Sequence, residues 1–157
     1  MPKQYWIVKS EPESFSIDDL AKAKNKTTYW DGVRNYQARN FMRDGMKLGD
    51  QVLFYHSNCE PTAVAGICEV VKEAYPDFTA FDPEDPHYDP KSKKDNPAWM
   101  MVDLKFVEKF KHAVTLDEIK NNPKLKDMRL VQRGNRLSVF PVEKNEFEEI
   151  KKMGSKN

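Results

Sequence analysis

Apolar residues gather along the chain in five short runs that predict β-strands. These runs span Tyr5–Val8, Gln51–Ser57, Ala63–Val71, Trp99–Val107 and Arg136–Val142. The second and third runs are apolar at both odd and even positions, a pattern typical of central strands that are covered on both faces. The turn-forming letters NCEPT between them predict an antiparallel hairpin. The fourth run alternates with charged residues and indicates a half-exposed strand.

Helix signals fall between these runs. The predicted helices extend from Ser16 to about Lys24, from Asn35 to Gly45, from Thr115 to just before Pro123, and over Glu143–Met153. The first and third begin with a capping box, in which a hydroxyl and a carboxylate three residues later satisfy each other's backbone amides. The second begins with an asparagine cap and ends at a glycine. Short helices mixed with strands favour an α+β fold on a small mixed or closed sheet.

Composition narrows the class of protein without giving a function. The chain has 157 residues and a net charge of +1, from 26 basic and 25 acidic side chains. It is therefore not a polycation that coats nucleic acid nonspecifically, although a local basic patch remains compatible with it. The length suits one domain, and no apolar run approaches the roughly 20 residues of a membrane-spanning helix. Two cysteines and a short apolar N-terminus predict a cytoplasmic protein, with the nucleus as the alternative.

The stretch YWDGVRNYQARNFMRDG, residues 29–45, is the strongest candidate for a binding site. One interpretation is a strand end, a glycine turn and an amphipathic helix with a solvated basic face. The other starts from Trp30, whose ring is positioned by the Asp-Gly turn that follows it. Arg34 and Asn35 stand at the helix start, where an anion is favoured, and an aromatic face beside such a site is suited to reading a nucleotide. Both interpretations are open at this point.

Two strand ends carry polar side chains. In FYHSN, alternation puts Phe54 and His56 on one face and Tyr55 and Ser57 on the other. A serine and a histidine on opposite faces cannot act as nucleophile and base, so both are interpreted as hydrogen-bonding groups. The turn KSEP after the first strand is similar and brings Lys9 and Ser10 to a strand end.

The proline-rich stretch 76–97 is predicted to be one long surface loop. Its acidic residues and His87 lack the glycine and terminal glutamate of a calcium loop, and the two cysteines lack zinc-site spacing. No phosphate-cradling loop and no nucleophile motif are present. We therefore predict no metal, no cofactor and no catalytic activity.

Six segments together resemble the EVE domain family. They are YWIVKSEP, WDGVRNYQARNFMR, GDQVLFYHSN, AYPDFTAFD, NPAWMMVDL and RLSVFPV, in the family's order along nearly the whole chain. The resemblance implies a PUA-like α+β fold, a small mixed β-barrel flanked by short helices, related to the YTH and SRA readers of methylated bases. It also implies one domain over residues 1–153 and a flexible tail at 154–157.

The function implied by the resemblance is noncatalytic recognition of a modified base in DNA or RNA. By similarity to the YTH readers, Trp30 would be the stacking wall of an aromatic pocket. The remaining predicted ligand contacts are Val33, Arg34, Asn35, Ser10, Tyr55, His56 and Ser57, and the predicted phosphate contacts are Lys9, Arg39, Arg43 and Arg136. The base would be a methylated or hydroxymethylated cytosine or a methyladenine, and we predict a monomer that binds no membrane.

Two other functions remain as alternatives. One is a small metal-dependent hydrolase or nuclease that uses His56 with carboxylates of the acidic loop, such as Asp82. The other is a module that binds a small ligand or a protein and never meets a polymer. Metal-dependent turnover would favour the first. Binding of free nucleosides as strong as binding of oligonucleotides, without salt dependence, would favour the second.

Overall fold

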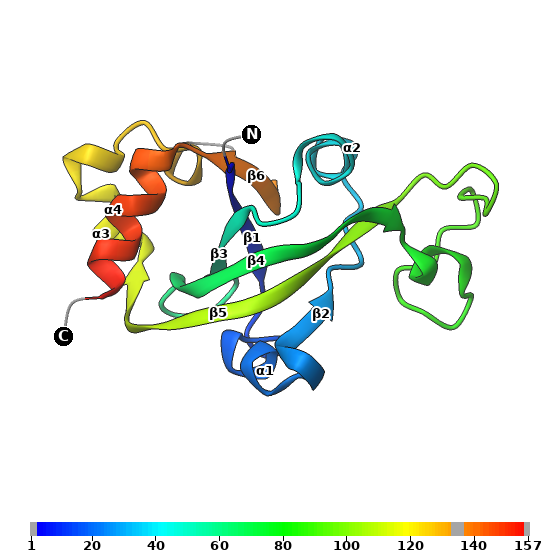
Figure 1. The fold of residues 1–157 in the computed structure, drawn as a ribbon, viewed down its shortest axis with the longest axis horizontal. Coiled ribbons are helices and arrows are strands. Elements are labelled where there is room, and N and C mark those ends of the chain that lie inside the picture. Colours follow the sequence, from blue (N-terminus) through cyan, green and yellow to red (C-terminus); the bar gives the residue numbers. More distant parts are fainter. Residues whose placement is uncertain (1–2, 133–136, 156–157) are drawn as a thin grey trace.

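The computed structural model describes residues 3–132 and 137–155, and its centre is a six-stranded mixed sheet (Figure 1). The strands are β1 (Tyr5–Ser10), β2 (Thr27–Tyr29), β3 (Gln51–His56), β4 (Ala63–Pro76), β5 (Met100–Thr115) and β6 (Val139–Val142). Their order is β2-β5-β4-β3-β1-β6. Only the pairing of β1 with β3 is parallel among the described strands. The predicted α+β class, the mixed sheet and the β3–β4 hairpin are confirmed, and hydrogen bonding does not close the sheet between β2 and β6.

The helices are short and begin where the caps predict. They are α1 (Ile17–Lys22), α2 (Tyr36–Asn40), α3 (Leu116–Lys120) and α4 (Lys144–Gly154), and α2 continues as a π-helical turn over Phe41–Gly45. Ser16 and Thr115 both form complete capping boxes. The Asn35 side chain accepts from the amide of Ala38, as predicted. Gly154, the first residue of the predicted tail, belongs to α4 and packs against the ring of Phe110.

Two hydrophobic cores lie on opposite faces of the sheet because strand side chains alternate. Trp6, Val8 and Phe54 belong to the core that also contains Trp30. Ile7 and Tyr55 belong to the other core, which α3 and α4 cover. This explains why β1 and β3 are apolar at successive positions. Within the described residues, no helix is both long and apolar enough to cross a membrane.

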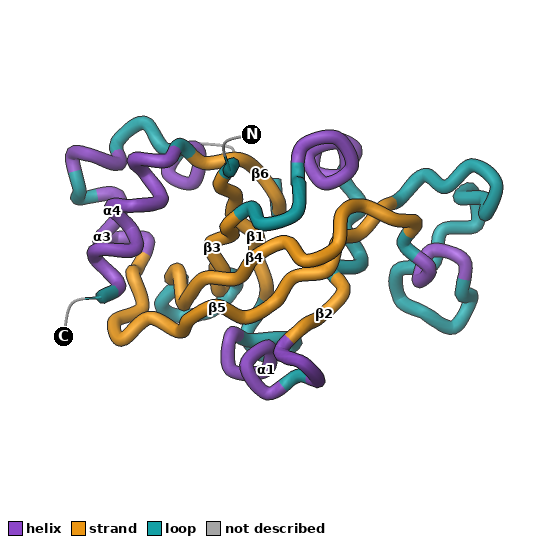
Figure 2. The backbone as a smooth tube through the Cα atoms, in the orientation of Figure 1, coloured by secondary structure: helices purple, strands orange, loops and turns teal. Residues whose placement is uncertain are grey.

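The hairpin of β4 and β5 is longer than predicted and positions a large loop. Figure 2 shows the two strands running side by side to one end of the molecule, where residues 77–99 leave the sheet. This segment, called the rim loop below, contains a short 3-10 helix over Phe78–Phe81. β2 is a three-residue strand that the apolar pattern did not predict, because TTY has no alternation long enough to identify. β6 begins at Val139, and the predicted strand residue Arg136 lies outside the described residues.

Candidate functional site

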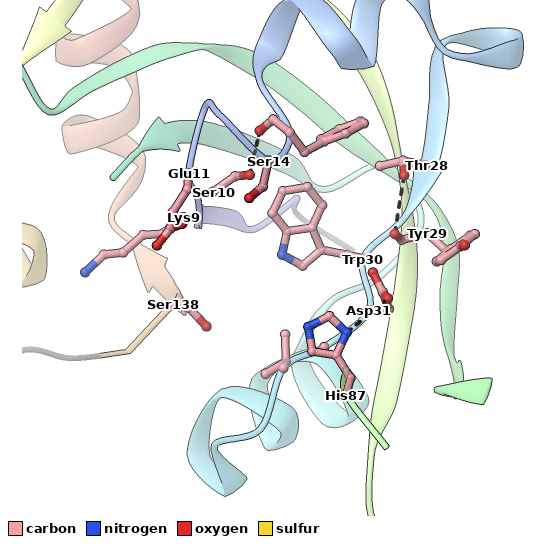
Figure 3. A pocket seen from close by; sticks show the side chains of 13 residues that line it. Lys9, Ser10, Glu11, Ser14, Thr28, Tyr29, Trp30, Asp31, His87 and Ser138 are labelled. Carbon is pink, nitrogen blue, oxygen red and sulfur yellow. Dashed lines mark hydrogen bonds and ion pairs between the residues drawn. The ribbon is translucent and has the colours of Figure 1, made fainter. Parts of the chain in front are cut away.

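A pocket of about 570 Å³ opens where the ends of β1 and β2 approach the rim loop (Figure 3). Its volume lies within the range typical of small-molecule sites, roughly 300–1,000 Å³. The lining residues are Lys9, Ser10, Glu11, Ser14, Phe15, Thr28, Tyr29, Trp30, Asp31, Gly32, Val33, His87 and Ser138. They come from four separate stretches of the chain. The predicted site residues Lys9, Ser10, Trp30 and Val33 are therefore brought together.

Trp30 is held firmly at the centre of these side chains. Its amide donates to the carbonyl of Val102 over 2.7 Å, which continues the pairing of β2 with β5. Its ring contacts Phe54 edge to face, with centroids 5.5 Å apart, and Phe15 at 6.4 Å. Only 9% of Trp30 is exposed. The indole is thus a fixed wall with a limited accessible area.

The turn after Trp30 requires glycine. Gly32 has a φ of +79°, a region that side chains rarely occupy. A Cβ there would also lie 2.6 Å from Nε2 of His87. The close approach of the imidazole to this backbone brings the rim loop directly over the pocket wall.

Arg34 joins the pocket wall to the rim loop. Its Nη2 and Nε donate to the carbonyl of His87 over 2.6 and 3.1 Å, and its Nη1 donates to Oδ2 of Asp77 over 3.0 Å. The side chain also contacts Thr79. These bonds occupy the guanidinium, so Arg34, which was predicted to contact ligand or phosphate, connects two segments of the protein.

Asp77 is the fully buried partner in this arrangement. It accepts from the amides of Gly32 and Thr79 as well as from Arg34. Burial alone raises the pKa of the Asp77 carboxyl, but the hydrogen bonds from Thr79, Gly32 and Arg34 outweigh it and hold the pKa below its usual value. Asp77 is therefore a charged anchor for the turn at residues 31–34.

The pocket rim carries a cluster of three ionisable side chains. Nδ1 of His87 lies 3.5 Å from Oδ2 of Asp31 and 3.3 Å from Oδ1 of Asp85. Burial raises the pKa of Asp31, and the neighbouring Asp77 adds to that effect. Within the described part of the chain, this is the one group of side chains arranged so that they could hold a metal ion.

Ser10 and Lys9 bring polar groups to the opposite side of the pocket. The hydroxyl of Ser10 donates to the carbonyl of Phe15 over 2.6 Å, which leaves its oxygen able to accept. Nζ of Lys9 lies 5.5 Å from the ring centre of Phe140 and 5.9 Å from that of Tyr55. Burial lowers the pKa of the Lys9 ammonium group.

The other residues predicted from the end of β3 take part in the fold instead. Tyr55 is buried in the second core, on the face of the sheet away from Trp30, and burial raises the pKa of its hydroxyl. Nε2 of His56 accepts from the amide of Ile17 at the start of α1. The amide of Ser57 donates to the carbonyl of Ser10. His56 and Ser57 thus support the segment that carries Ser14 and Phe15.

The predicted basic stripe on α2 is also engaged within the protein. Asn35 is used as the helix cap, Arg39 donates to the carbonyl of Ala98 over 2.7 Å, and Arg43 pairs with Asp44 over 2.9 Å. Arg39 also lies over the ring of Tyr36. Arg136 lies outside the described residues.

Sequence reasoning missed most of the polar lining. The lining residues that were not predicted as contacts include Glu11, Ser14, Phe15, Thr28, Tyr29, Asp31, His87 and Ser138. The usable signal was the length of the rim loop, because long loops in compact domains commonly carry function. No periodic pattern indicates that His87 lies against Gly32.

The chain is a PUA-like α+β protein. Its mixed six-stranded sheet and short flanking helices define this class. The chain belongs to the EVE domain family, whose model matches residues 4–153. This confirms the resemblance seen in the sequence motifs.

Named relatives and solved structures agree with this assignment. Thymocyte nuclear protein 1 of Gallus gallus is 50% identical over 161 residues, covering 92% of this chain and 66% of the relative. This chain thus spans just under two thirds of that protein. A hypothetical protein from Leishmania major has 52% identity and a TM-score of 0.90, covering 98% of this chain and 95% of that one. Human THYN1 protein in complex with 5-methylcytosine-containing DNA has 46% identity and a TM-score of 0.91, covering 99% of both chains.

Proposed function

We propose that this protein binds DNA and accepts a modified cytosine, turned out of the base stack, into the pocket beside Trp30. The supporting observation is that human THYN1 protein, a match over 99% of both chains, forms a complex with DNA containing 5-methylcytosine. The pocket of about 570 Å³ beside the fixed indole is the site this proposal uses. Turning a base out of a duplex costs a few kcal/mol, which the pocket and the phosphate contacts must offset.

Stacking on Trp30 supplies part of that free energy. Base–aromatic stacking contributes about 1–3 kcal/mol. Because only 9% of Trp30 is exposed, the lower part of that range is the relevant one. A buried methyl group adds about 0.8 kcal/mol, so the methyl alone gives only about fourfold selectivity. Polar contacts to the base edge must therefore contribute to recognition.

The carboxylates of the pocket favour cytosine over thymine. Cytosine offers its exocyclic amine as a donor, whereas thymine has a carbonyl at the same position. Asp31 and Glu11 both line the pocket, and carboxylates are the usual acceptors for that amine. Glu11 already accepts from Asn58 over 2.7 Å, which makes Asp31 the less occupied of the two. Oδ2 of Asp31 faces Nδ1 of His87 at 3.5 Å, so we assign the other carboxylate oxygen, Oδ1, to the cytosine amine.

A binding function without chemistry is favoured over the hydrolase alternative. That alternative needs His56 as an acid or base, but its Nε2 accepts from the amide of Ile17, and burial lowers the pKa of the ring. The hydroxyl of Ser10 donates to a backbone carbonyl, so no neighbouring base activates it.

The same proposal covers hydroxymethylcytosine, methyladenine and RNA as weaker ligands. The name of the relatives, Thymocyte nuclear protein 1, supports a location with DNA in a eukaryotic nucleus over the cytoplasmic location predicted from the sequence. A small-ligand module remains distinguishable because it would bind free nucleosides as tightly as oligonucleotides.

The test is fluorescence anisotropy with labelled oligonucleotides, single- and double-stranded, of DNA and RNA. Each carries cytosine, 5-methylcytosine, 5-hydroxymethylcytosine or N6-methyladenine at one position. We expect the tightest binding to 5-methylcytosine DNA, and we expect Trp30→Phe to weaken it about threefold to tenfold. Phenylalanine is chosen over alanine because Trp30 also packs on Phe54.

Tyr36→Ala is the matched control, because Tyr36 is an aromatic residue that is 60% exposed and lies outside the pocket. The affinity of Tyr36→Ala for 5-methylcytosine DNA should equal that of the wild type. Equal binding of all oligonucleotides, or equal effects of the two substitutions, would reject the pocket as the base site.

A further inference from the structure

Asp31, Asp85 and His87 bring one possible ligand atom each close together at the pocket rim. One atom from each side chain lies within 4.8 Å of the other two. Figure 3 shows the His87 imidazole beside the Asp31 carboxylate, on the side of the pocket that the rim loop forms. The two carboxylate oxygens lie 3.5 and 3.3 Å from Nδ1 of His87.

These separations suit a shared cation better than direct hydrogen bonds. An N–H···O bond is normally about 2.7–3.2 Å long, and Nδ1 of His87 is buried without a hydrogen-bond partner among the described residues. In a tetrahedral zinc site with bonds of about 2.0–2.1 Å, neighbouring ligand atoms lie roughly 3.3–3.4 Å apart. The two separations measured at His87 are close to that value.

We propose that Asp31, Asp85 and His87 form a binding site for a divalent transition-metal ion, with Zn²⁺ as the best match. One imidazole nitrogen and two carboxylate oxygens are ligands that zinc accepts, with water as the fourth. Calcium needs six to eight oxygen ligands, and magnesium prefers an octahedral oxygen shell, so neither fits a set of two oxygens and one nitrogen.

Backbone amides and Arg34 hold the ligand residues in place. Arg34 fixes the backbone of His87 through two hydrogen bonds to its carbonyl. The amide of His87 donates to Oδ1 of Asp85 over 2.8 Å, which orients that carboxylate. The backbone on both sides of Asp31 is bonded, since the Trp30 amide donates to Val102 and the Gly32 amide donates to Asp77. Hydrogen bonds of this kind orient the ligands of known metal sites and tune their affinity.

The site would fasten the rim loop to the pocket wall. Asp31 belongs to the wall, whereas Asp85 and His87 belong to the loop. The side chains are 28%, 24% and 42% exposed, respectively, so an ion can enter from solvent. A cation bound here would offset the repulsion between Asp31 and Asp85, whose ligand oxygens lie within 4.8 Å of each other. Bound metal should therefore stabilise the folded protein.

The experiment is isothermal titration calorimetry with Zn²⁺, in the absence of DNA. It uses a Cys59→Ser background to remove the less buried of the two free thiols. We expect saturable binding of one ion per chain, and Asp85→Asn and His87→Gln should each weaken it by about tenfold or more. A Co²⁺ titration should give the intense visible bands of a tetrahedral site, reversed by a chelator. Zn²⁺ should also raise Tm, because it binds only the folded chain.

His112→Gln is the matched control, since His112 and Glu118 form an exposed histidine–carboxylate pair with only two ligands. Its Zn²⁺ affinity should equal that of the background. Absence of saturable binding, or unchanged affinity in Asp85→Asn and His87→Gln, would overturn the site. Metal-free melting curves of each variant establish that the fold is intact. Asp85 does not line the pocket. DNA affinity measured with a chelator present, which removes bound metal, therefore tests the base site separately from the metal site.

Discussion

The amide of Gly32 donates to Oδ2 of Asp77 over 2.8 Å, and this bond joins the wall of the pocket to the rim loop. The same carboxylate oxygen accepts from Arg34, which in turn holds the carbonyl of His87. Two segments far apart in the sequence are thus fixed to each other by a single buried carboxylate. The shape of the pocket depends on these contacts as much as on the residues that line it.

Gly32→Ala should destabilise the protein and disturb the pocket. The positive φ at Gly32 makes alanine strained, which costs about 1 kcal/mol or more, and the new Cβ would lie 2.6 Å from the His87 ring. The measurement is urea denaturation together with DNA affinity. Gly49→Ala is the control, because Gly49 also has a positive φ but its nearest neighbour is Cε of Lys3 at 3.7 Å. Equal losses in both variants would mean that contact with His87 contributes nothing.

Asp77→Ala should be among the most destabilising substitutions in the rim loop. It removes the carboxylate that pairs with Arg34 and leaves the Gly32 amide unsatisfied, and breaking such a buried pair costs about 3–5 kcal/mol. Arg34 is 23% exposed, so water relieves part of that cost and the lower end is expected. Urea denaturation measures the loss. Asp44→Ala, which breaks an exposed pair with Arg43, should change stability by less than about 1 kcal/mol.

Stability should also fall at acid pH through Asp77. Its folded pKa lies below that of the unfolded chain, so its contribution is present above the unfolded value of about 3.9 and is lost as pH falls through the folded value. Asp77→Asn should flatten this part of the stability curve. An unchanged acid slope in that variant would assign the loss to other carboxylates.

His56 should make stability depend on pH in a second range. Here the cause is the burial of a neutral ring, whereas at Asp77 it is the hydrogen bonding of a charged carboxylate. Burial lowers the pKa of the ring, so the folded protein holds His56 neutral while the unfolded chain binds a proton below about 6.5. Stability is therefore greatest above that pH and decreases as pH falls toward the folded pKa. His56→Gln keeps an acceptor for the Ile17 amide and should remove this slope, as measured by denaturation from pH 5 to 8.

Local patterns predicted the fold well because the decisive interactions are local or periodic. Ser16 and Thr115 cap the helices that their capping boxes indicate, and successive apolar residues in β3 are buried on two faces. β2 ends at Tyr29, which agrees with the strand end that one interpretation of residues 29–45 contained, but its pairing with β5 is set by tertiary contacts and was not predicted. Alternation also placed Tyr55 opposite Phe54, and the structure bears this out by burying Tyr55 away from Trp30.

The site was only partly predictable because its partners are distant in the sequence. Trp30 was identified from the turn that follows it and Val33 from the family resemblance, and both line the pocket. Arg34 was predicted as a ligand contact, because nothing near it in the sequence indicates Asp77 or His87, which reach it only through the rim loop. A basic residue at a helix start indicates anion binding only when it forms no ion pair with a buried carboxylate, as Arg34 does with Asp77.

Lys9 should contribute to the salt dependence of DNA binding. It lines the pocket, and its contacts are to the rings of Tyr55 and Phe140. If Lys9 binds a phosphate, Lys9→Met should reduce the slope of log K against log salt by about 0.9 and weaken all sequences equally. Anisotropy titrations at several salt concentrations measure the slope. Arg43→Met is the control, because Arg43 is paired with Asp44 and lies outside the pocket, so its slope should match that of the wild type. An unchanged slope in Lys9→Met would move the phosphate contacts to another surface.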